Sequence, residues 1–258
     1  MITIAILNLK GGVGKTTISM NLGAALSRLG KKVLLVDMDS QNDLTQNLGL
    51  NPATTKGVEF LITNDIPLKM LLEKYDENLH FIPSGKKLKE LELSLSKLYK
   101  KKPKSNYLLK YMFNQYHLDY DYVIFDCANT TGLLNFNVLT LVKNVFIPVQ
   151  CHMLGLRGSK RTLFFVNKIE ALYNSGLRIA GIIPAMYDAR NSLSGRVIKE
   201  MEKTYDGLVL NTKIRVNVSL AESPAFGKTI FDYKPHSRGA QDFHDLANEV
   251  LVMFEEIY

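Results

Sequence analysis

The chain has 258 residues, of which 46% are hydrophobic and 22% are charged, a balance that excludes disorder over most of its length. No apolar run approaches the ~18 residues of a membrane helix and no linker divides the sequence, so we expect one domain over residues 1–258 and no export signal. The formal charge of +7 suggests a polyanionic partner. Charge alone favours nucleic-acid binding no more than its absence, because many basic proteins bind no nucleic acid.

Apolar runs and helical patterns alternate along the chain. Short runs rich in β-branched residues predict strands at residues 2–7, 32–36, 80–83, 122–125, 145–149 and 179–183. Apolar residues at helical spacing predict helices over 18–29, most of 52–115 and 154–173, and a turn is expected at 101–104. This alternation predicts an α/β fold with a doubly wound, mostly parallel sheet and helices on both faces.

The last predicted helix has an apolar face. Phe243, Leu246, Val250 and Phe254 recur at helical spacing, which favours packing in the core. A membrane anchor is disfavoured because the segment ends with two glutamates and lacks a basic polar face.

The two cysteines indicate a reducing compartment. Cys127 and Cys151 lie far apart in apolar surroundings, so we expect buried free thiols and no disulfide. The sequence therefore predicts a cytoplasmic protein.

A glycine-rich loop joins the first strand to the first helix. Gly11, Gly12 and Gly14 leave room for backbone N–H groups to converge on phosphate oxygens. Lys15 can reach the β- and γ-phosphates, and the Thr16 hydroxyl can bind Mg²⁺. The strand before the loop and the helix after it favour a nucleotide site over a structural turn.

Residues 10–17, Lys-Gly-Gly-Val-Gly-Lys-Thr-Thr, resemble the deviant Walker A signature of the ParA/MinD family of P-loop ATPases. Similar segments follow in the family's order at 37–42, 121–127, 148–151, 186–190 and 222–228. The resemblance covers nearly the whole chain, is closest to ParA/Soj-type partition ATPases, and implies ATP and Mg²⁺ as ligands.

Chemistry and resemblance together assign the candidate site. Nucleotide binding is expected of Lys10, Gly11, Gly12, Val13, Gly14, Lys15, Thr16, Thr17, Arg215 and Asn217. Lys10, Lys15 and Asp39 are expected to be catalytic. Thr16, Asp37 and Asp126 are expected to help hold Mg²⁺.

The resemblance implies that Lys10 crosses a nucleotide-sandwich dimer to the partner's phosphates, although a solvated loop lysine is the alternative. Asp39 is expected to orient the attacking water, with weak basal turnover. Ser40 replaces the family's proline, Asn42 its glycine, and Ala128-Asn129-Thr130 its Pro-Pro-Ser, changes that bear on the hydrolysis rate.

ParA proteins bind DNA without sequence preference through basic residues on the face of the dimer. Arg190 matches one such position, and Lys213 and Arg215 lie beside positions where arginines are expected. Val216 and Ser219 occupy those positions themselves.

The leading hypothesis is a cytoplasmic, nucleoid-associated partition ATPase that dimerises with ATP and is released from DNA by a ParB-like protein. A MinD-like ATPase acting on a non-DNA cargo or surface is second, without membrane binding. An electron-transfer iron protein would need paired cysteines, and an ATP-holding module without hydrolysis is the remaining class. No N-terminal helix-turn-helix domain is expected, since the first strand begins at Ile2.

Overall fold

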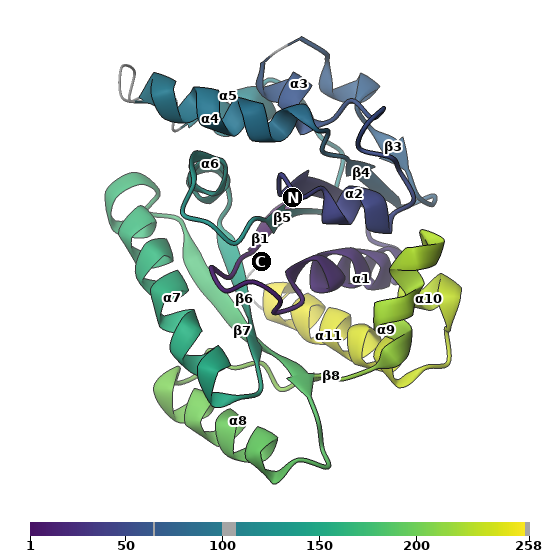
Figure 1. Ribbon diagram of the computed structural model, residues 1–258, viewed down its shortest axis with the longest axis vertical. Helices are drawn as coiled ribbons and strands as arrows, with labels where there is room; N and C mark the ends of the chain where they lie inside the picture. The colour runs from purple at the N-terminus through teal and green to yellow at the C-terminus, as the bar shows by residue number, and fades with distance from the viewer. Residues whose placement is uncertain (64, 100–106, 256–258) are drawn as a thin grey trace.

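The computed structural model describes residues 1–63, 65–99 and 107–255 and arranges them around an eight-stranded sheet (Figure 1). The strands are β1 (Ile2–Ile6), β2 (Val33–Met38), β3 (Glu73–Lys74), β4 (Leu79–Ile82), β5 (Tyr122–Cys127), β6 (Asn144–Gln150), β7 (Arg178–Tyr187) and β8 (Ile214–Arg215). Their order is β3-β4-β2-β5-β1-β6-β7-β8, and every pair is parallel except β3 with β4. The predicted doubly wound, mostly parallel sheet is confirmed.

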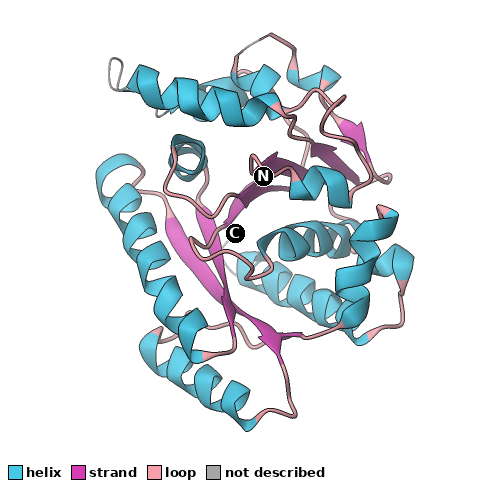
Figure 2. Cartoon of the chain, viewed as in Figure 1, coloured by secondary structure: helices cyan, strands magenta, loops and turns pink. Residues whose placement is uncertain are grey.

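Helices cover both faces of this sheet, as Figure 2 shows. They are α1 (Lys15–Arg28), α2 (Asp43–Asn47), α3 (Val58–Ile62), α4 (Lys87–Tyr99), α5 (Leu108–Asn114), α6 (Leu133–Leu141), α7 (Met153–Tyr173), α8 (Ser192–Thr204), α9 (Val218–Glu222), α10 (Ile230–Tyr233) and α11 (Arg238–Glu255), with short 3-10 turns at Leu68–Met70 and Ser223–Phe226. Buried side chains of α1, α2, α9, α10 and α11 pack on one face, and those of α3 to α8 pack on the other. No helix in the described ranges is long and apolar enough to cross a membrane.

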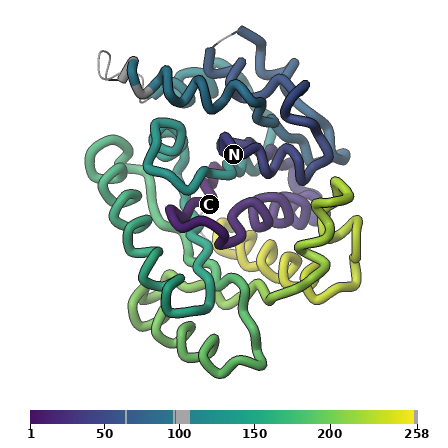
Figure 3. The backbone as a smooth tube through the Cα atoms, viewed as in Figure 1, coloured from purple at the N-terminus to yellow at the C-terminus, as the bar shows by residue number. Residues whose placement is uncertain are grey.

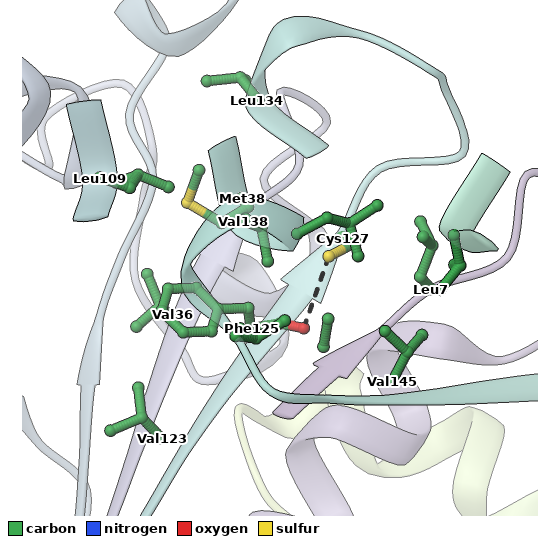
Figure 4. Close-up of a cluster of buried hydrophobic side chains, with 14 of the residues drawn as sticks. Leu7, Val36, Met38, Leu109, Val123, Phe125, Cys127, Leu134, Val138 and Val145 are labelled. Carbon is green, nitrogen blue, oxygen red and sulfur yellow. Dashed lines mark hydrogen bonds between the residues drawn. The ribbon is translucent and has the colours of Figure 1, made fainter. Parts of the chain in front are cut away.

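Two cores result from the alternation of side chains along the central strands. On β5, Val123, Phe125 and Cys127 face the cluster under α5 and α6 (Figure 4), whereas Tyr122 and Ile124 face α1 and α11. Both faces are buried, so β5 is apolar as parallel strands usually are, except for the buried Asp126 near its carboxyl end. Both cysteines are buried and unpaired, as expected.

The last helix closes the second core. Its four predicted apolar side chains are all buried, which confirms a core-packing helix. Phe254 lies with its ring centroid 6.3 Å from that of Tyr122 and 6.4 Å from that of Phe146, and the Arg178 guanidinium lies 5.8 Å above it. The end of α11 is therefore held near the residues that begin β5, β6 and β7.

The segment between residues 52 and 115 is less helical than predicted. Its described residues form three helices, one 3-10 turn and two strands, and of the two strands only β4 was predicted. Glu73 and Lys74 of β3 are exposed and pair only through their backbones, so no apolar pattern marks this strand. The turn predicted at 101–104 lies outside the described residues.

The carboxyl ends of β1, β2, β5 and β6 meet at one edge of the sheet, because neighbouring strands run in the same direction. Figure 3 traces the purple loop between β1 and α1 beside the teal loop that follows β5. Ligands of open α/β sheets bind at this kind of edge.

Candidate nucleotide site

The loop between β1 and α1 is shaped to surround phosphates. Gly12 (φ +71°) and Gly14 (φ +86°) are in the left-handed region, where a side chain would strain the backbone. A Cβ on Gly11 would lie 2.9 Å from the Asn129 side chain, so the bare backbone permits the loop after β5 to approach. α1 begins directly afterwards at Lys15, so its positive N-terminal end faces the same space.

A cavity of about 500 Å³ opens over this loop and brings residues 11–17 together with Asp39, Asp43 and Asn129. It adjoins a more apolar pocket of about 250 Å³, whose lining includes Val13, Met186 and Asn217 and shares Gly14 and Thr17 with the first cavity. A polar space beside an apolar one fits a triphosphate joined to a base.

Asp126 lies beneath the phosphate loop, fully buried near the end of β5. Its Oδ1 accepts a hydrogen bond from Ser19 Oγ on α1 at 2.8 Å, but its buried Oδ2 has no partner among the described residues. Burial raises the pKa of Asp126 to about 7, with the Asp37 charge adding to the rise and the hydrogen bond from Ser19 opposing it.

This carboxylate fits a magnesium ion held with the nucleotide. A cation would satisfy the unpartnered oxygen and stabilise the charged form, and Thr16 adds a hydroxyl oxygen from the first turn of α1. The described residues contain no cluster of three or more His, Cys, Asp or Glu side chains able to hold a metal alone. Magnesium usually keeps waters and phosphate oxygens as ligands, so a site with few protein ligands is expected.

Asp37 supports the loop that carries Asp39. It lies in register with Asp126 on the neighbouring strand and is fully buried. Its Oδ2 accepts hydrogen bonds from the Thr45 hydroxyl at 2.6 Å and the Thr45 backbone at 3.0 Å, and its Oδ1 accepts one from the Asp39 backbone at 3.1 Å. Burial raises the pKa of Asp37 to about 6, and these hydrogen bonds limit the rise.

The loop at residues 39–43 is fixed by the segment that follows β4. The Asp39 carbonyl accepts a hydrogen bond from Ser84 Oγ at 3.3 Å, and Asn42 Nδ2 donates to the same hydroxyl at 2.7 Å. Asn42 is left-handed (φ +60°), which explains how it can stand where the family has glycine. Buried Glu59 in turn accepts the Gly85 backbone N–H at 3.0 Å. Ser84 and Glu59 belong to no motif and were not predicted.

Lys10 lies apart from the other loop residues. It does not line the phosphate cavity, and its Nζ donates to Gln150 Oε1 at 2.9 Å. Its backbone N–H donates to buried Asn8, whose amide donates to the Pro148 carbonyl. Of the two loop lysines, Lys15 therefore faces the chain's own nucleotide site, and Lys10 points toward the end of β6.

The remaining predicted nucleotide residues lie beside the apolar pocket. Arg215 and Asn217 both line it, but the Arg215 guanidinium is ion-paired with Asp242, which also accepts the Arg215 backbone N–H at 2.9 Å. Asn217 Oδ1 accepts the Ser219 N–H at 2.8 Å and so caps α9.

The residues predicted to bind DNA lie around the ends of β7 and β8. The Arg190 side chain is 88% exposed and pairs with Asp188 at 3.0 Å. Lys213 Nζ lies 5.9 Å above the Tyr187 ring, and Arg215 is the residue paired with Asp242. Arg190 is thus the most accessible of the three predicted cations.

Replacing Arg215 with alanine is expected to lower the free energy of unfolding by about 2 kcal/mol, because it leaves the Asp242 carboxylate, 5% exposed, without its cation. Urea unfolding of R215A measures the loss, and R196A, which removes an exposed arginine, is the control. The loss should shrink below about 1 kcal/mol in a D242N background, where no charge is stranded. An equal loss in both backgrounds would assign the effect to packing.

Known proteins resemble this chain over most of its length. A family model described as an AAA domain matches residues 1–179. The sporulation initiation inhibitor protein Soj of Bacillus subtilis (strain 168) is 40% identical over 249 residues, 96% of this chain and 97% of that protein. The chromosome-partitioning ATPase Soj of Treponema pallidum is 35% identical over 250 residues, 96% of each chain.

The fold also resembles solved structures. Cobyrinic acid a,c-diamide synthase from Mycobacterium smegmatis, with bound ADP and magnesium, superposes with a TM-score of 0.86 at 29% identity, over 100% of this chain and 97% of that one. The same synthase with an ATP analogue and magnesium superposes with a TM-score of 0.85. These bound ligands agree with the ATP and Mg²⁺ predicted here, and the family model and the Soj proteins establish that this chain belongs to the ParA/MinD family of ATPases.

Proposed function

We propose that residues 1–258 form one ParA-type ATPase domain that partitions plasmid or chromosomal DNA. It binds MgATP, forms a nucleotide-sandwich dimer, associates with DNA without sequence preference, and is released when a ParB-like partner stimulates hydrolysis. The observation that carries the proposal is Lys10, which lies outside its own phosphate cavity while Lys15 lines it. A lysine so placed is available to a second copy facing the same edge.

In this mechanism the chain positions groups and neutralises charge, which is most of what phosphoryl transfer requires. Lys15 and the loop N–H groups would hold the β- and γ-phosphates. Thr16 and Asp126 would hold Mg²⁺, which supplies further neutralisation of the phosphates when bound. Asp39 would orient the attacking water, and Asp37 holds the Asp39 backbone in place.

The basic residues near α8 support a DNA surface and nucleoid association. Lys199 and Lys203 are exposed on this helix, and exposed Arg190 lies in the turn just before it. Contacts of this kind release counterions from DNA, so binding should weaken steeply as salt increases.

Binding to random-sequence duplex DNA tests the proposal. We expect ATP, but not ADP, to promote binding, and we expect a rise from 50 to about 200 mM salt to weaken it at least tenfold. The K10A variant should bind ATP but remain a monomer. ATP should therefore not increase its affinity for DNA. Fluorescence anisotropy with labelled DNA measures both effects, and DNA binding that ignores the nucleotide would contradict the proposal.

A second function, positioning of a non-DNA cargo, is favoured by one observation. Val216 is 61% exposed and Val218 is 70% exposed, on the segment where the family resemblance leads us to expect arginines. An apolar surface there suits a protein better than DNA. ATP-dependent dimerisation without DNA binding at low salt would favour this alternative.

A further inference from the structure

Gln150, the last residue of β6, uses every hydrogen-bonding position of its side-chain amide. Oε1 accepts from Lys10 Nζ at 2.9 Å and lies 2.7 Å from His152 Nε2. Nε2 donates to the Gly12 carbonyl at 2.7 Å and to Met186 Sδ at 3.2 Å. One side chain thus joins the signature lysine, the phosphate loop and the ends of two strands.

The neighbours determine which way this amide faces. His152 Nδ1 accepts the Gly155 backbone N–H at 3.0 Å, so a neutral His152 carries its proton on Nε2 and donates it to Gln150. Burial and the nearby Lys10 charge lower the pKa of His152, which favours the neutral ring. A flipped amide would turn its NH₂ toward Lys10 and His152, both donors, and its oxygen toward the Gly12 carbonyl. The observed orientation is the one that satisfies all four contacts.

Gly158 on α7 also helps to position the Lys10 side chain. A Cβ on Gly158 would lie 3.1 Å from Lys10 Cδ, closer than most such contacts, and 3.5 Å from Lys10 Cβ, an ordinary contact distance. The stem of Lys10 therefore lies against bare helix backbone, while its ammonium group contacts Gln150. Two elements far apart in sequence from the loop hold this lysine on its own chain.

We propose that Gln150 is a positioning residue that retains Lys10 on the resting monomer and sets the protein concentration at which ATP produces the dimer. The inference rests on the proposed function, in which Lys10 must reach a second copy's phosphates. Lys10 must break its hydrogen bond to Gln150 before it can reach those phosphates. A stronger bond between Lys10 and Gln150 therefore opposes dimerisation. The bond from Gln150 to the Gly12 carbonyl is a separate contribution to the shape of the phosphate loop.

Two substitutions separate these contributions. Q150A and Q150E both remove the donor to Gly12, so both should weaken ADP binding to the monomer, and Q150E should weaken it more because a carboxylate oxygen then faces the Gly12 carbonyl. They act oppositely on Lys10, because alanine removes its acceptor and glutamate replaces the amide oxygen with a carboxylate that holds a cation more strongly. If Gln150 had only a structural role, both substitutions would change the Lys10 labelling rate and the half-dimerisation concentration in the same direction.

The first experiment labels nucleotide-free protein with an acetylating ester and follows Lys10 against exposed Lys199 by mass spectrometry. We expect Q150A to speed Lys10 labelling about fivefold and Q150E to slow it about fivefold. G158A, which crowds the lysine stem, should also speed labelling. Q241A, on exposed Gln241 of α11, is the control and should leave the rate unchanged.

The second experiment measures dimerisation by sedimentation velocity at saturating ATP. Q150A should lower the half-dimerisation concentration about fivefold and Q150E should raise it by a similar factor. Shifts in the same direction, or none in either assay, would overturn the inference. If labelling shifts in opposite directions but the wild type stays monomeric in ATP, the retention of Lys10 stands and the proposed dimer is wrong.

Discussion

Replacing Asp39 with alanine is expected to slow ATP hydrolysis about 100-fold while ATP-dependent dimerisation persists. The carboxylate lines the phosphate cavity, and its backbone is fixed by Asp37 and Ser84, so it suits the orientation of a water molecule. Losing a group that positions or deprotonates the nucleophile usually costs about 10²–10⁴ in rate. Binding should survive because Lys15 and the glycine backbone remain.

Single-turnover phosphate release measures the rate for D39A, and sedimentation with ATP measures the dimer. D206A, which removes an exposed acid after α8, serves as the matched control. An unchanged hydrolysis rate in D39A would transfer the water-positioning role to another residue of the cavity.

Replacing Asp126 with asparagine is expected to stabilise the nucleotide-free protein and to abolish its stabilisation by MgATP. The pKa of Asp126 is about 7 in the folded protein, against 3.8 as its ordinary value. The folded state therefore binds more protons than the unfolded chain between these values, and stability falls as pH rises from about 4 to 7. Above pH 7 the full penalty of a buried charge remains, and asparagine removes it.

We expect D126N to gain on the order of 2 kcal/mol at pH 8 without nucleotide, and much less at pH 4, where the aspartate is already neutral. Addition of MgATP should stabilise the wild type and leave D126N nearly unchanged, since the ligand for the cation is lost. Urea unfolding at both pH values, with D206N as control, measures these differences. A D126N protein that is less stable at pH 8 without nucleotide would contradict the assignment.

The parts of the site that lie close together in sequence could be predicted. The phosphate loop, Lys15 and Thr16 belong to one motif between a strand and a helix. Asp126 is distant in sequence, but it lies near the end of a strand whose apolar pattern is plain. Ser84, Glu59 and Gln150 could not be found in this way. Their contacts depend on which strands are neighbours, and an apolar pattern does not show that β4 lies beside β2 or that β6 ends beside the loop.

The same limit applies to the fold. Six strands have enough apolar residues to be recognised, whereas β3 and β8 have two residues each and are defined by their backbone pairing. Arg215 shows what a sequence leaves out about a cation. It lines the apolar pocket, as a predicted nucleotide residue should, but the folded chain also pairs it with the buried Asp242 carboxylate, which no sequence pattern indicates.

The end of α11 packs against the first residues of the central strands, and Ile2 begins β1 beside them, bonded to the Asp121 carbonyl at 2.7 Å. Both ends of the described chain therefore lie at the amino ends of the central strands, opposite the edge that carries the phosphate loop. A fluorescent protein attached next to Ile2 would extend away from the edge where a second copy is proposed to bind. Imaging of tagged molecules in living cells can thus follow assembly and release without the label standing between the two subunits.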